Sequence, residues 1–517
     1  MNIGQLKGKK VAILGIGMEG IALADFVVNY TSDITLLDKL SEGELEQKVC
    51  EMRDEKLGRI LSDNRFKKSF GSEYLDNLTD FEIIFRSPGV PYLEPKIREV
   101  KVNGIEISSQ IKLFFDLCPC PIIGVTGTKG KGTTSTLIQL MLKKFQETRD
   151  NNQTNSKSEI SNSNQITNSL INQSTNIYLA GNIGEPAITL IDKLSKDDTV
   201  ILELSSFQLQ DMEKSPHIAV VLNISIDHLD YHKDEAEYKK SKVNIVEYQS
   251  KDDYAIVNQD YLTSFEFASQ TDAQVYYFST KDSVDQGAFV RKSQITNHKS
   301  QINSKSQKLN KQEIYEAVLR IDEKEEIICQ SDEIQLIGKH NLENIAAASI
   351  AAKLAGADIE SIKSVAKEFK GLTHRLEFIK EIRGVKYYND SFATNPGPTM
   401  AAINSFDQPT HLILGGSSKG ADFSEMAQMI NKSNIASVSL IGVEAEKIKK
   451  ALDESGYDGA LSNLSGDINN IVSEVSKKSK LGDVVLFSPA CASFDMFKNY
   501  KDRGEKFKKA VLSMGNS

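Results

Sequence analysis

The sequence predicts an α/β protein with three domains in series, each built around a mostly parallel sheet. Two observations lead to this prediction. Apolar strand signals alternate with helical patterns along most of the chain, which is the order typical of parallel sheets. The length of 517 residues also allows roughly three domains of about 150 residues each. We therefore expect domains at 1–110, 111–373 and 374–517.

The first domain begins with the pattern of a βαβ unit. A strand over 11–14 leads into a turn with three glycines at 15–20, a helix follows over 21–29, and a second strand over 34–37 ends at Asp38. This spacing of glycines and acidic residue matches the dinucleotide fingerprint. It indicates a Rossmann-like fold and, taken alone, a site for NAD or FAD.

A second glycine-rich motif opens the central domain. An apolar strand over 122–125 runs into a glycine-rich turn, Lys131 and a helical pattern. Glycines let backbone N–H groups turn toward phosphate oxygens, and the helix start adds its positive dipole end. Because Gly132 stands where the P-loop pattern has Ser or Thr, the hydroxyl for Mg²⁺ must come from Thr133 or Thr134. The predicted triphosphate cradle comprises Gly127, Thr128, Lys129, Gly130, Lys131, Gly132, Thr133 and Thr134.

Acidic and imidazole side chains follow the next two strands of the central domain. Glu203 ends the strand over 200–203, and Asp227, His228 and Asp230 follow the strand over 218–222. The carboxyl ends of strands in such sheets line the ligand crevice, so we expect these groups beside the phosphates. Carboxylate and imidazole ligands there suit a divalent metal that bridges phosphates.

Two polar segments interrupt the central domain, at about 146–176 and 293–312. Of residues 151–176, 20 are Asn, Gln, Ser or Thr. Such a composition buries too little apolar surface to fold, so we predict loops. The first loop leaves the end of the P-loop helix opposite the phosphates and is expected to lie far from the chemistry.

The third domain repeats the strand-and-helix alternation. Strand signals recur at 385–388, 412–414, 438–441 and 484–487, with helical patterns between them. This order predicts a second Rossmann-like domain with a mostly parallel sheet.

Charge and cysteine content limit the classes of function. A net charge of −9 argues against nucleic acid as the main partner. No apolar run approaches the roughly 20 residues of a membrane span, and the N-terminus lacks a signal-peptide pattern. Five scattered cysteines fit reduced thiols in a cytoplasm. We expect a cytoplasmic monomer that binds small molecules and does not insert into membranes.

Seven motifs resemble, in order, those of the Mur ligases, the ATP-dependent amide ligases that build the peptidoglycan stem peptide. They lie at 127–131, 181–184, 203–206, 223–228, 374–375, 389–391 and 488–493. The run over 488–507 is most similar to the member that adds D-glutamate. The resemblance covers nearly the whole chain apart from the polar segments. It implies that ATP drives the joining of D-glutamate to UDP-N-acetylmuramoyl-L-alanine through an acyl phosphate, in cytoplasmic peptidoglycan precursor synthesis.

By this resemblance the first domain holds the UDP of the substrate rather than a dinucleotide. The resemblance implies that the pyrophosphate contacts Gly17, Met18 and Glu19, and that the uracil or ribose contacts Asp38 and Lys39. It also implies that Ser87 and Gly89 close over the nucleotide, and that Asn182 and Ser205 contact the muramoyl-alanine part.

The resemblance also implies the ATP contacts and two Mg²⁺ ions. Lys131 would hold the outer phosphates. Glu203 and either Thr133 or Thr134 would bind one metal ion, and His228 would bind the other. Lys242, 14 residues after His228, matches the family lysine that reacts with CO₂ to give a metal-binding carbamate. The remaining implied ATP contacts are Arg375 at the phosphates, Asp390 at the ribose or metal, and Asn258 and Asn341 on the adenine side.

The amino-acid end of the reaction is implied in the third domain. Lys419, Ser493, Phe494 and Tyr500 match the pocket for D-glutamate. Phe392 departs from the family pattern, because it stands where a lysine is usual and so removes one cation from the clamp.

Other functions remain open on the sequence. Within the superfamily, another Mur-type or a folylpolyglutamate-type ligase would take a different acceptor, although folate ligases begin near their P-loop and lack the first domain. A nicotinamide-dependent oxidoreductase with a regulatory nucleotide site and a non-catalytic nucleotide-binding scaffold are interpretations from other classes.

Overall fold

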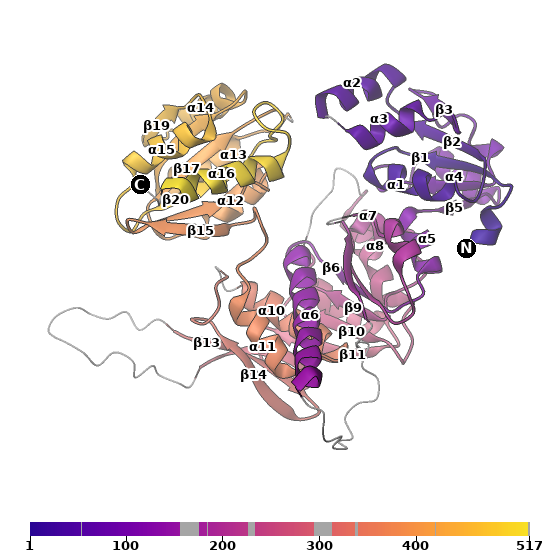
Figure 1. Ribbon diagram of the computed structural model, residues 1–517, viewed down its shortest axis with the longest axis horizontal. Helices are drawn as coiled ribbons and strands as arrows, with labels where there is room; N and C mark the ends of the chain where they lie inside the picture. Colours follow the sequence, from indigo (N-terminus) through magenta and orange to yellow (C-terminus); the bar gives the residue numbers. More distant parts are fainter. Residues whose placement is uncertain are drawn as a thin grey trace. The chain divides into compact units, whose positions relative to one another are not determined.

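The computed structural model describes residues 1–52, 54–155, 175–182, 185–225, 233–293, 313–336, 340–418 and 420–514 (Figure 1). The chain divides into two compact units, and each is described by itself. The first unit holds Met1–Val49 and Asp54–Phe369, and the second holds Lys370–Ser517 with Cys50–Arg53. Several predicted features lie outside the described residues: Asp227, His228, Asp230, Lys419 and most of both polar segments.

The N-terminal sheet of the first unit has five parallel strands in the order β3-β2-β1-β4-β5, as expected for a Rossmann-like fold. The helix after β1 begins at Met18, three residues earlier than predicted, because Gly17 is its N-cap. The elements are η1 (Ile3–Leu6), β1 (Lys10–Leu14), α1 (Met18–Val27), β2 (Asp33–Asp38), α2 (Glu42–Met52), α3 (Glu55–Ser62), β3 (Phe66–Phe70), η2 (Leu78–Asp80), β4 (Ile83–Arg86), α4 (Pro95–Val102), β5 (Glu106–Ser108) and α5 (Gln110–Leu117).

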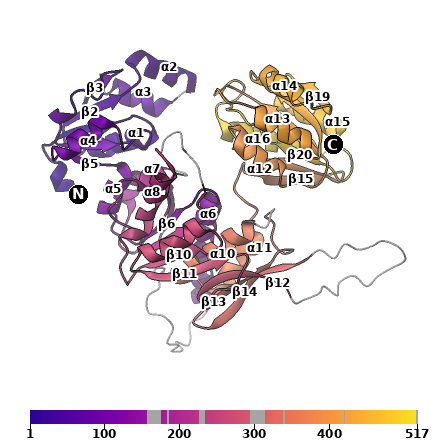
Figure 2. The ribbon, with the colours of Figure 1, turned by 180° about the vertical axis from the view of Figure 1, so that it is seen from behind.

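The central sheet of the first unit has nine strands in the order β14-β13-β12-β11-β10-β9-β6-β8-β7. Neighbours from β7 to β12 pair in parallel, which confirms the mostly parallel sheet, whereas β12, β13 and β14 form an antiparallel ribbon (Figure 2). The strands are β6 (Ile122–Thr126), β7 (Ile177–Gly181), β8 (Thr199–Glu203), β9 (Ile218–Val221), β10 (Tyr254–Asn258), β11 (Gln274–Ser279), β12 (Gly287–Lys292), β13 (Tyr315–Ile321) and β14 (Lys324–Gln330).

The helix after the P-loop is longer than the sequence suggested. Helix α6 runs from Lys131 to Asn155, so the loop predicted from residue 146 was wrong over its first ten residues. The side-chain amide of Gln146 on this helix donates to the carbonyl of Thr175, just before β7, over 2.6 Å. Helices α10 and α11 pack beside α6 (Figure 1). The other helices of this region are η3 (Ala187–Lys193), α7 (Ser206–Leu209), α8 (Glu235–Glu247), α9 (Leu262–Phe265), η4 (Glu266–Gln270), α10 (His340–Leu354) and α11 (Ile359–Glu368).

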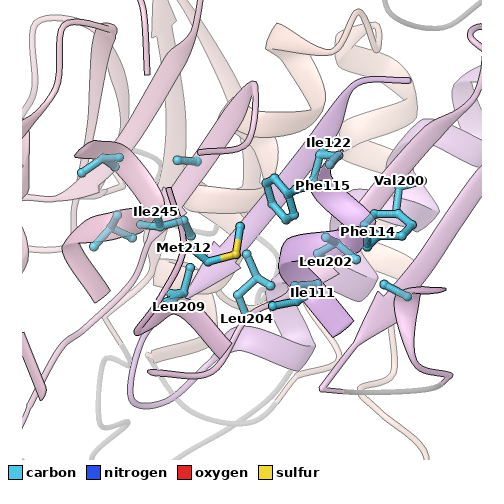
Figure 3. Packing of buried hydrophobic residues seen from close by; sticks show 14 of the residues in the cluster. Ile111, Phe114, Phe115, Ile122, Val200, Leu202, Leu204, Leu209, Met212 and Ile245 are labelled. Carbon is cyan, nitrogen blue, oxygen red and sulfur yellow. The ribbon is translucent and has the colours of Figure 1, made fainter. Parts of the chain in front are cut away.

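Helix α5 connects the two sheets of the first unit through its packing. Ile111, Phe114 and Phe115 lie in the core under the central sheet, with Ile122 among their partners (Figure 3). Leu113, on another side of the same helix, lies in the core of the N-terminal sheet. Each such buried side chain stabilises the fold by roughly 1.5–3 kcal/mol. The N-terminal and central parts are thus packed into one unit.

The second unit has six strands in the order β15-β16-β20-β17-β18-β19. Among the described strands of this unit, only β15, at the edge, pairs antiparallel, so the predicted Rossmann-like domain is confirmed. Among the described residues of the whole chain, no helix is both long and apolar enough to cross a bilayer. The elements are β15 (Glu377–Ile382), β16 (Val385–Asn389), α12 (Pro396–Ile403), β17 (Thr410–Gly415), α13 (Ser424–Lys432), β18 (Ile435–Ile441), α14 (Ala445–Glu454), β19 (Ala460–Asn463), α15 (Ile468–Lys478), β20 (Val484–Phe487) and α16 (Tyr500–Met514).

Candidate active site

The predicted phosphate cradle is the loop between β6 and α6. Gly127 and Gly130 have φ angles of +154° and +87°, which side chains rarely adopt. A Cβ atom at Gly127 would lie 2.7 Å from the Cβ of Leu222, and one at Gly130 would lie 2.4 Å from Oδ1 of Asn344. The loop therefore requires glycine at both positions, as the motif predicted.

Two lysines reach this loop from different helices. Nζ of Lys131 donates to the carbonyls of Gly127 and Thr128, over 2.9 and 3.2 Å. Nζ of Lys242, on α8, donates to the carbonyl of Gly127 over 3.2 Å and to Oγ1 of Thr126 over 3.3 Å. Lys242 is 1% exposed, and its ammonium lies 5.0 Å from the ring centre of Tyr238. The fold thus brings together two lysines that are 111 residues apart in sequence.

Glu203 lies at the carboxyl end of β8, beside the strand that leads into the loop. It is 3% exposed, and its Oε1 accepts from the side-chain amide of Asn182 over 3.1 Å. Its Oε2 is buried and lacks a hydrogen-bond partner among the described residues. Since an unpartnered buried carboxylate oxygen is unfavourable, and Mg²⁺ prefers such oxygens, Glu203 fits a metal ligand.

The two candidate hydroxyls differ in their surroundings. Thr134 is fully buried, and its Oγ1 donates to Oδ1 of Asn344 over 3.3 Å. Asn344 in turn donates to Oδ1 of Asn341 over 3.1 Å, so this hydroxyl belongs to a buried polar chain on α10. Thr133 is only half-buried. Thr133 is therefore the better candidate for a metal-binding hydroxyl.

The predicted adenine contact Asn258 is engaged within the protein. Its side chain is fully buried; its Nδ2 donates to Oε1 of Glu343 over 2.6 Å, and its Oδ1 accepts from the backbone of Asp260 over 2.8 Å. Burial raises the pKa of Glu343 to about 7, with Asp260 adding to the effect. The sequence did not indicate Glu343 as a partner of Asn258, because a single acidic residue in a helical pattern does not reveal which residue it will contact.

In the N-terminal sheet, the residues predicted to bind UDP stabilise the turn itself. Asp38 accepts from the backbone N–H groups of Ile16 and Leu40, over 2.9 and 3.0 Å. Oγ of Ser87 donates to the carbonyl of Gly15 over 2.5 Å. The exposed predicted residues around this turn are Gly17, Met18, Lys39 and Gly89.

Glu19 differs from the other residues of this turn. Its carboxyl group turns toward the central part of the unit and accepts from the side-chain amide of Gln208 over 2.7 Å. Gln208 lies two residues after the motif at 203–206 and forms the capping box of α7 together with Ser205. The predicted UDP and muramoyl-alanine contacts are therefore joined by a direct hydrogen-bond path.

In the second unit, Arg375, Phe392 and Tyr500 form one cluster. The guanidinium carbon of Arg375 lies 3.8 Å from the ring centre of Phe392, and the ring of Tyr500 meets that of Phe392 edge-on at 5.1 Å. Asp390 accepts from Oγ of Ser488 over 2.6 Å. Burial raises the pKa of Asp390 to about 7.

Arg503 organises the loops around this cluster and was missed as a functional residue. It donates to both oxygens of Ser391, over 2.9 and 2.8 Å, and to the carbonyls of Cys491 and Ala492, each over 3.0 Å. Its desolvation lowers its pKa to about 10. Arg503 is fully buried, and its position in the first turn of a helix does not predict this from the sequence.

The predicted D-glutamate pocket is described only in part. The backbone of Ser417 donates to the carbonyl of Ala492 over 2.9 Å, and that of Phe494 donates to Oγ of Ser417 over 3.1 Å. Ser493 is buried and Phe494 is 43% exposed. The loop that precedes Lys419 thus lies against the segment that contains Ser493 and Phe494.

Three family descriptions match this chain. "Mur ligase MurD-like, N-terminal domain" matches residues 9–109, "Mur ligase middle domain" matches residues 125–352, and "Mur ligase, glutamate ligase domain" matches residues 374–491. Among solved structures, the UDP-N-acetylmuramate-alanine ligase MurC of Thermotoga maritima is 16% identical with a TM-score of 0.51, over 98% of this chain and all of that one. MurF of Acinetobacter baumannii is 16% identical with a TM-score of 0.53, over 78% of each chain. These two structures support the fold.

Curated relatives are closer in sequence. The UDP-N-acetylmuramoylalanine–D-glutamate ligase of Acetivibrio thermocellus is 37% identical over 515 residues, which cover 99% of this chain and 97% of the relative. The enzyme of the same name from Clostridium tetani is 35% identical over 98% of this chain and 97% of its own length. With this identity over nearly its full length, and with the motifs that its sequence displays, the chain belongs to the Mur ligase family.

Proposed function

We propose that this protein uses ATP to join D-glutamate to UDP-N-acetylmuramoyl-L-alanine in peptidoglycan precursor synthesis. The names of its relatives and the match to the glutamate ligase domain support this function. The observation that carries it is the convergence of Lys131 and Lys242 on the P-loop carbonyl of Gly127. A triphosphate site built this way suits phosphoryl transfer better than hydride transfer.

The chemistry explains why such a site is needed. A carboxylate is a poor electrophile, so the γ-phosphoryl group of ATP first moves onto the alanine carboxylate, giving an acyl phosphate and ADP. The amine of D-glutamate then attacks the carbonyl carbon, phosphate leaves, and the amine loses a proton. Both reactants of the first step are anions, so cationic groups must shield them. Lys131 would do this at the outer phosphates.

Two Mg²⁺ ions would lower the repulsion between the phosphates and the carboxylate when bound. The unpartnered Oε2 of Glu203 and the half-buried hydroxyl of Thr133 suit one of them. His228, predicted for the other, lies outside the described residues, and no group of three or more His, Cys, Asp or Glu side chains forms a metal site within those residues.

We also propose that Lys242 carries a carbamate, formed when its neutral amine adds to CO₂ and releases a proton. Its side chain is buried beside the P-loop, where a second ammonium group is already present. A carbamate would turn this cation into an anionic metal ligand. The exposed Lys240, two residues away on α8, lacks this environment.

The remaining assignments follow the same proposal. The UDP group would lie at the turn after β1, near Lys39 and Gly89, and D-glutamate near Lys419, Ser493 and Phe494. We further propose a monomeric, cytoplasmic enzyme. All five cysteines are free, which suits a reducing compartment.

The direct test is phosphate release from ATP with UDP-N-acetylmuramoyl-L-alanine and a panel of amino acids. We expect release with D-glutamate that requires all three substrates and Mg²⁺. Release with a different amino acid would contradict the acceptor and leave the ligase chemistry in place. Oxidation of a nicotinamide cofactor without phosphate release would contradict the ligase.

A further inference from the structure

A partly buried polar bridge joins the turn after β1 to the start of α7 within the first unit. We propose that Glu19 and Gln208 are positioning residues that couple this turn to Ser205, and that the charge of Glu19 makes binding of the UDP-substrate depend on pH. The inference rests on the proposed function, because it takes the anionic pyrophosphate to lie at this turn.

The amide of Gln208 has a fixed orientation. Its Oε1 accepts from the backbone N–H and the hydroxyl of Ser205, over 2.9 and 3.0 Å. Its Nε2 donates to Oε1 of Glu19 over 2.7 Å. Gln208 is 2% exposed, so water cannot readily replace these partners. Reversing the amide would turn its N–H group toward the backbone N–H of Ser205, so the present orientation links the position of Ser205 to that of Glu19.

A second contact holds the same junction. Arg86, which directly precedes Ser87, donates to Oδ2 of Asp211 and to the carbonyl of Phe207, each over 3.3 Å. It also donates to the carbonyl of Val90 over 2.7 Å. Arg86 is 1% exposed and Asp211 is 8% exposed, so both charges are buried at the junction. The two contacts restrict how far the turn can move from α7.

The charged groups that act on Glu19 come from both sides of the junction. Burial raises its pKa to about 7, Asp211 adds to this rise, and Gln208 and Arg86 oppose it. Glu19 therefore changes charge near neutral pH. A carboxylate in the first turn of α1 would repel a pyrophosphate bound at the N-terminus of that helix, whereas the neutral acid would not. Binding should weaken as pH rises through about 7.

The test is the Kd for UDP-N-acetylmuramoyl-L-alanine, measured by calorimetry at pH 6 and pH 8.5 without ATP. If the bound anion raises the pKa of Glu19 by about one unit, the wild-type Kd should rise about sevenfold between these values. Glu19→Gln keeps an acceptor for Gln208 but cannot titrate, so its Kd should stay constant. Glu46→Gln, at an exposed carboxylate on α2, is the control and should retain the wild-type slope.

A second variant tests the bridge itself. Gln208→Glu keeps acceptors for Ser205 but places a second carboxyl group beside Glu19, so the midpoint of the pH dependence should move to higher pH. In turnover assays the same changes should appear in KM for the UDP-substrate and not in KM for ATP.

The outcomes separate this inference from the proposed function. Equal pH slopes of Kd in the wild type and Glu19→Gln would overturn the inference alone. No binding at either pH would overturn the proposed function, and the inference with it. A pH-dependent wild-type Kd that becomes constant in Glu19→Gln supports it even if D-glutamate is not the acceptor.

Discussion

The ammonium groups of Lys131 and Lys242 meet at a single atom, the carbonyl oxygen of Gly127, with Nζ–O distances of 2.9 and 3.2 Å. Two cations this close repel each other, most strongly where water is excluded. A carbamate on Lys242 would replace this repulsion by attraction. The proximity of the two ammonium groups is therefore a physical reason for the proposed carbamate on Lys242 of α8.

Lys131→Ala should lower the rate of phosphate transfer by about a thousandfold, because it removes a cation that stabilises charge on the outer phosphates. The measurement is phosphate release under saturating substrates. Lys143→Ala, at an exposed position on the same helix, should leave the rate unchanged. Near-wild-type turnover of Lys131→Ala would refute the P-loop assignment.

Lys242→Ala should be inactive, and a short carboxylate added to the buffer should restore part of the activity. In the wild type, CO₂-free buffer should lower activity reversibly, because the carbamate decomposes. Lys240→Ala is the matched control on α8 and should behave as the wild type. If neither bicarbonate nor a carboxylate rescues Lys242→Ala, the carbamate role is wrong.

Thr133→Val should raise the Mg²⁺ concentration needed for half-maximal activity, because it removes the proposed ligand. Thr134→Val should instead lower the free energy of unfolding by about 1 kcal/mol, since only its bond to Asn344 is lost. Activity titrations with Mg²⁺ and urea unfolding separate the two effects. An exchange of these two outcomes would assign the metal-binding hydroxyl to Thr134.

Phe392→Lys should lower KM for D-glutamate, because it restores the cation of the family pattern. The same change removes the ring that stacks on Arg375 and adds a like charge near it, so KM for ATP should rise. Phe392→Leu removes the ring alone and should affect only KM for ATP. A Phe392→Lys enzyme with unchanged KM for D-glutamate would show that this position does not face the acceptor.

Asp390→Asn should alter how stability depends on pH. The pKa of Asp390 is about 7 in the fold and about 4 in an unfolded chain, so the fold binds more protons between these values. Its contribution to stability is complete below about pH 4 and is lost as pH rises through about 7. Urea unfolding followed by circular dichroism at pH 5 and pH 8 should show a smaller decline for Asp390→Asn. Equal declines would contradict the raised pKa.

Local patterns predicted the fold because each βα step is encoded within a few residues. The strand over 122–125 and the glycines at 127 and 130 specify the P-loop, since the strained angles and close contacts there exclude side chains. The antiparallel ribbon of β12–β14 escaped prediction, because strands beside a polar segment give no sign of their direction.

The site was harder to predict where its contacts span the chain. Glu19 and Gln208 are 189 residues apart, and Arg503 and Ser391 are 112 apart. Such pairs form only when separate elements pack. Glu19 and Ser391 lie in recognisable motifs, but nothing in a motif says which distant residue its members will contact. Family resemblance supplied Lys242, which the structure then located beside the P-loop.

Helix α5 has a consequence for how this protein can be divided. The sequence places the first boundary at residue 110, at the start of α5, yet Leu113 packs into one core and Phe114 into the other. A fragment ending at residue 110 would lose Leu113 and leave a hole in its core. A fragment beginning at residue 111 would expose that side chain to water. The two parts are therefore expected to melt in one cooperative transition, and a severed N-terminal piece should be prone to aggregation.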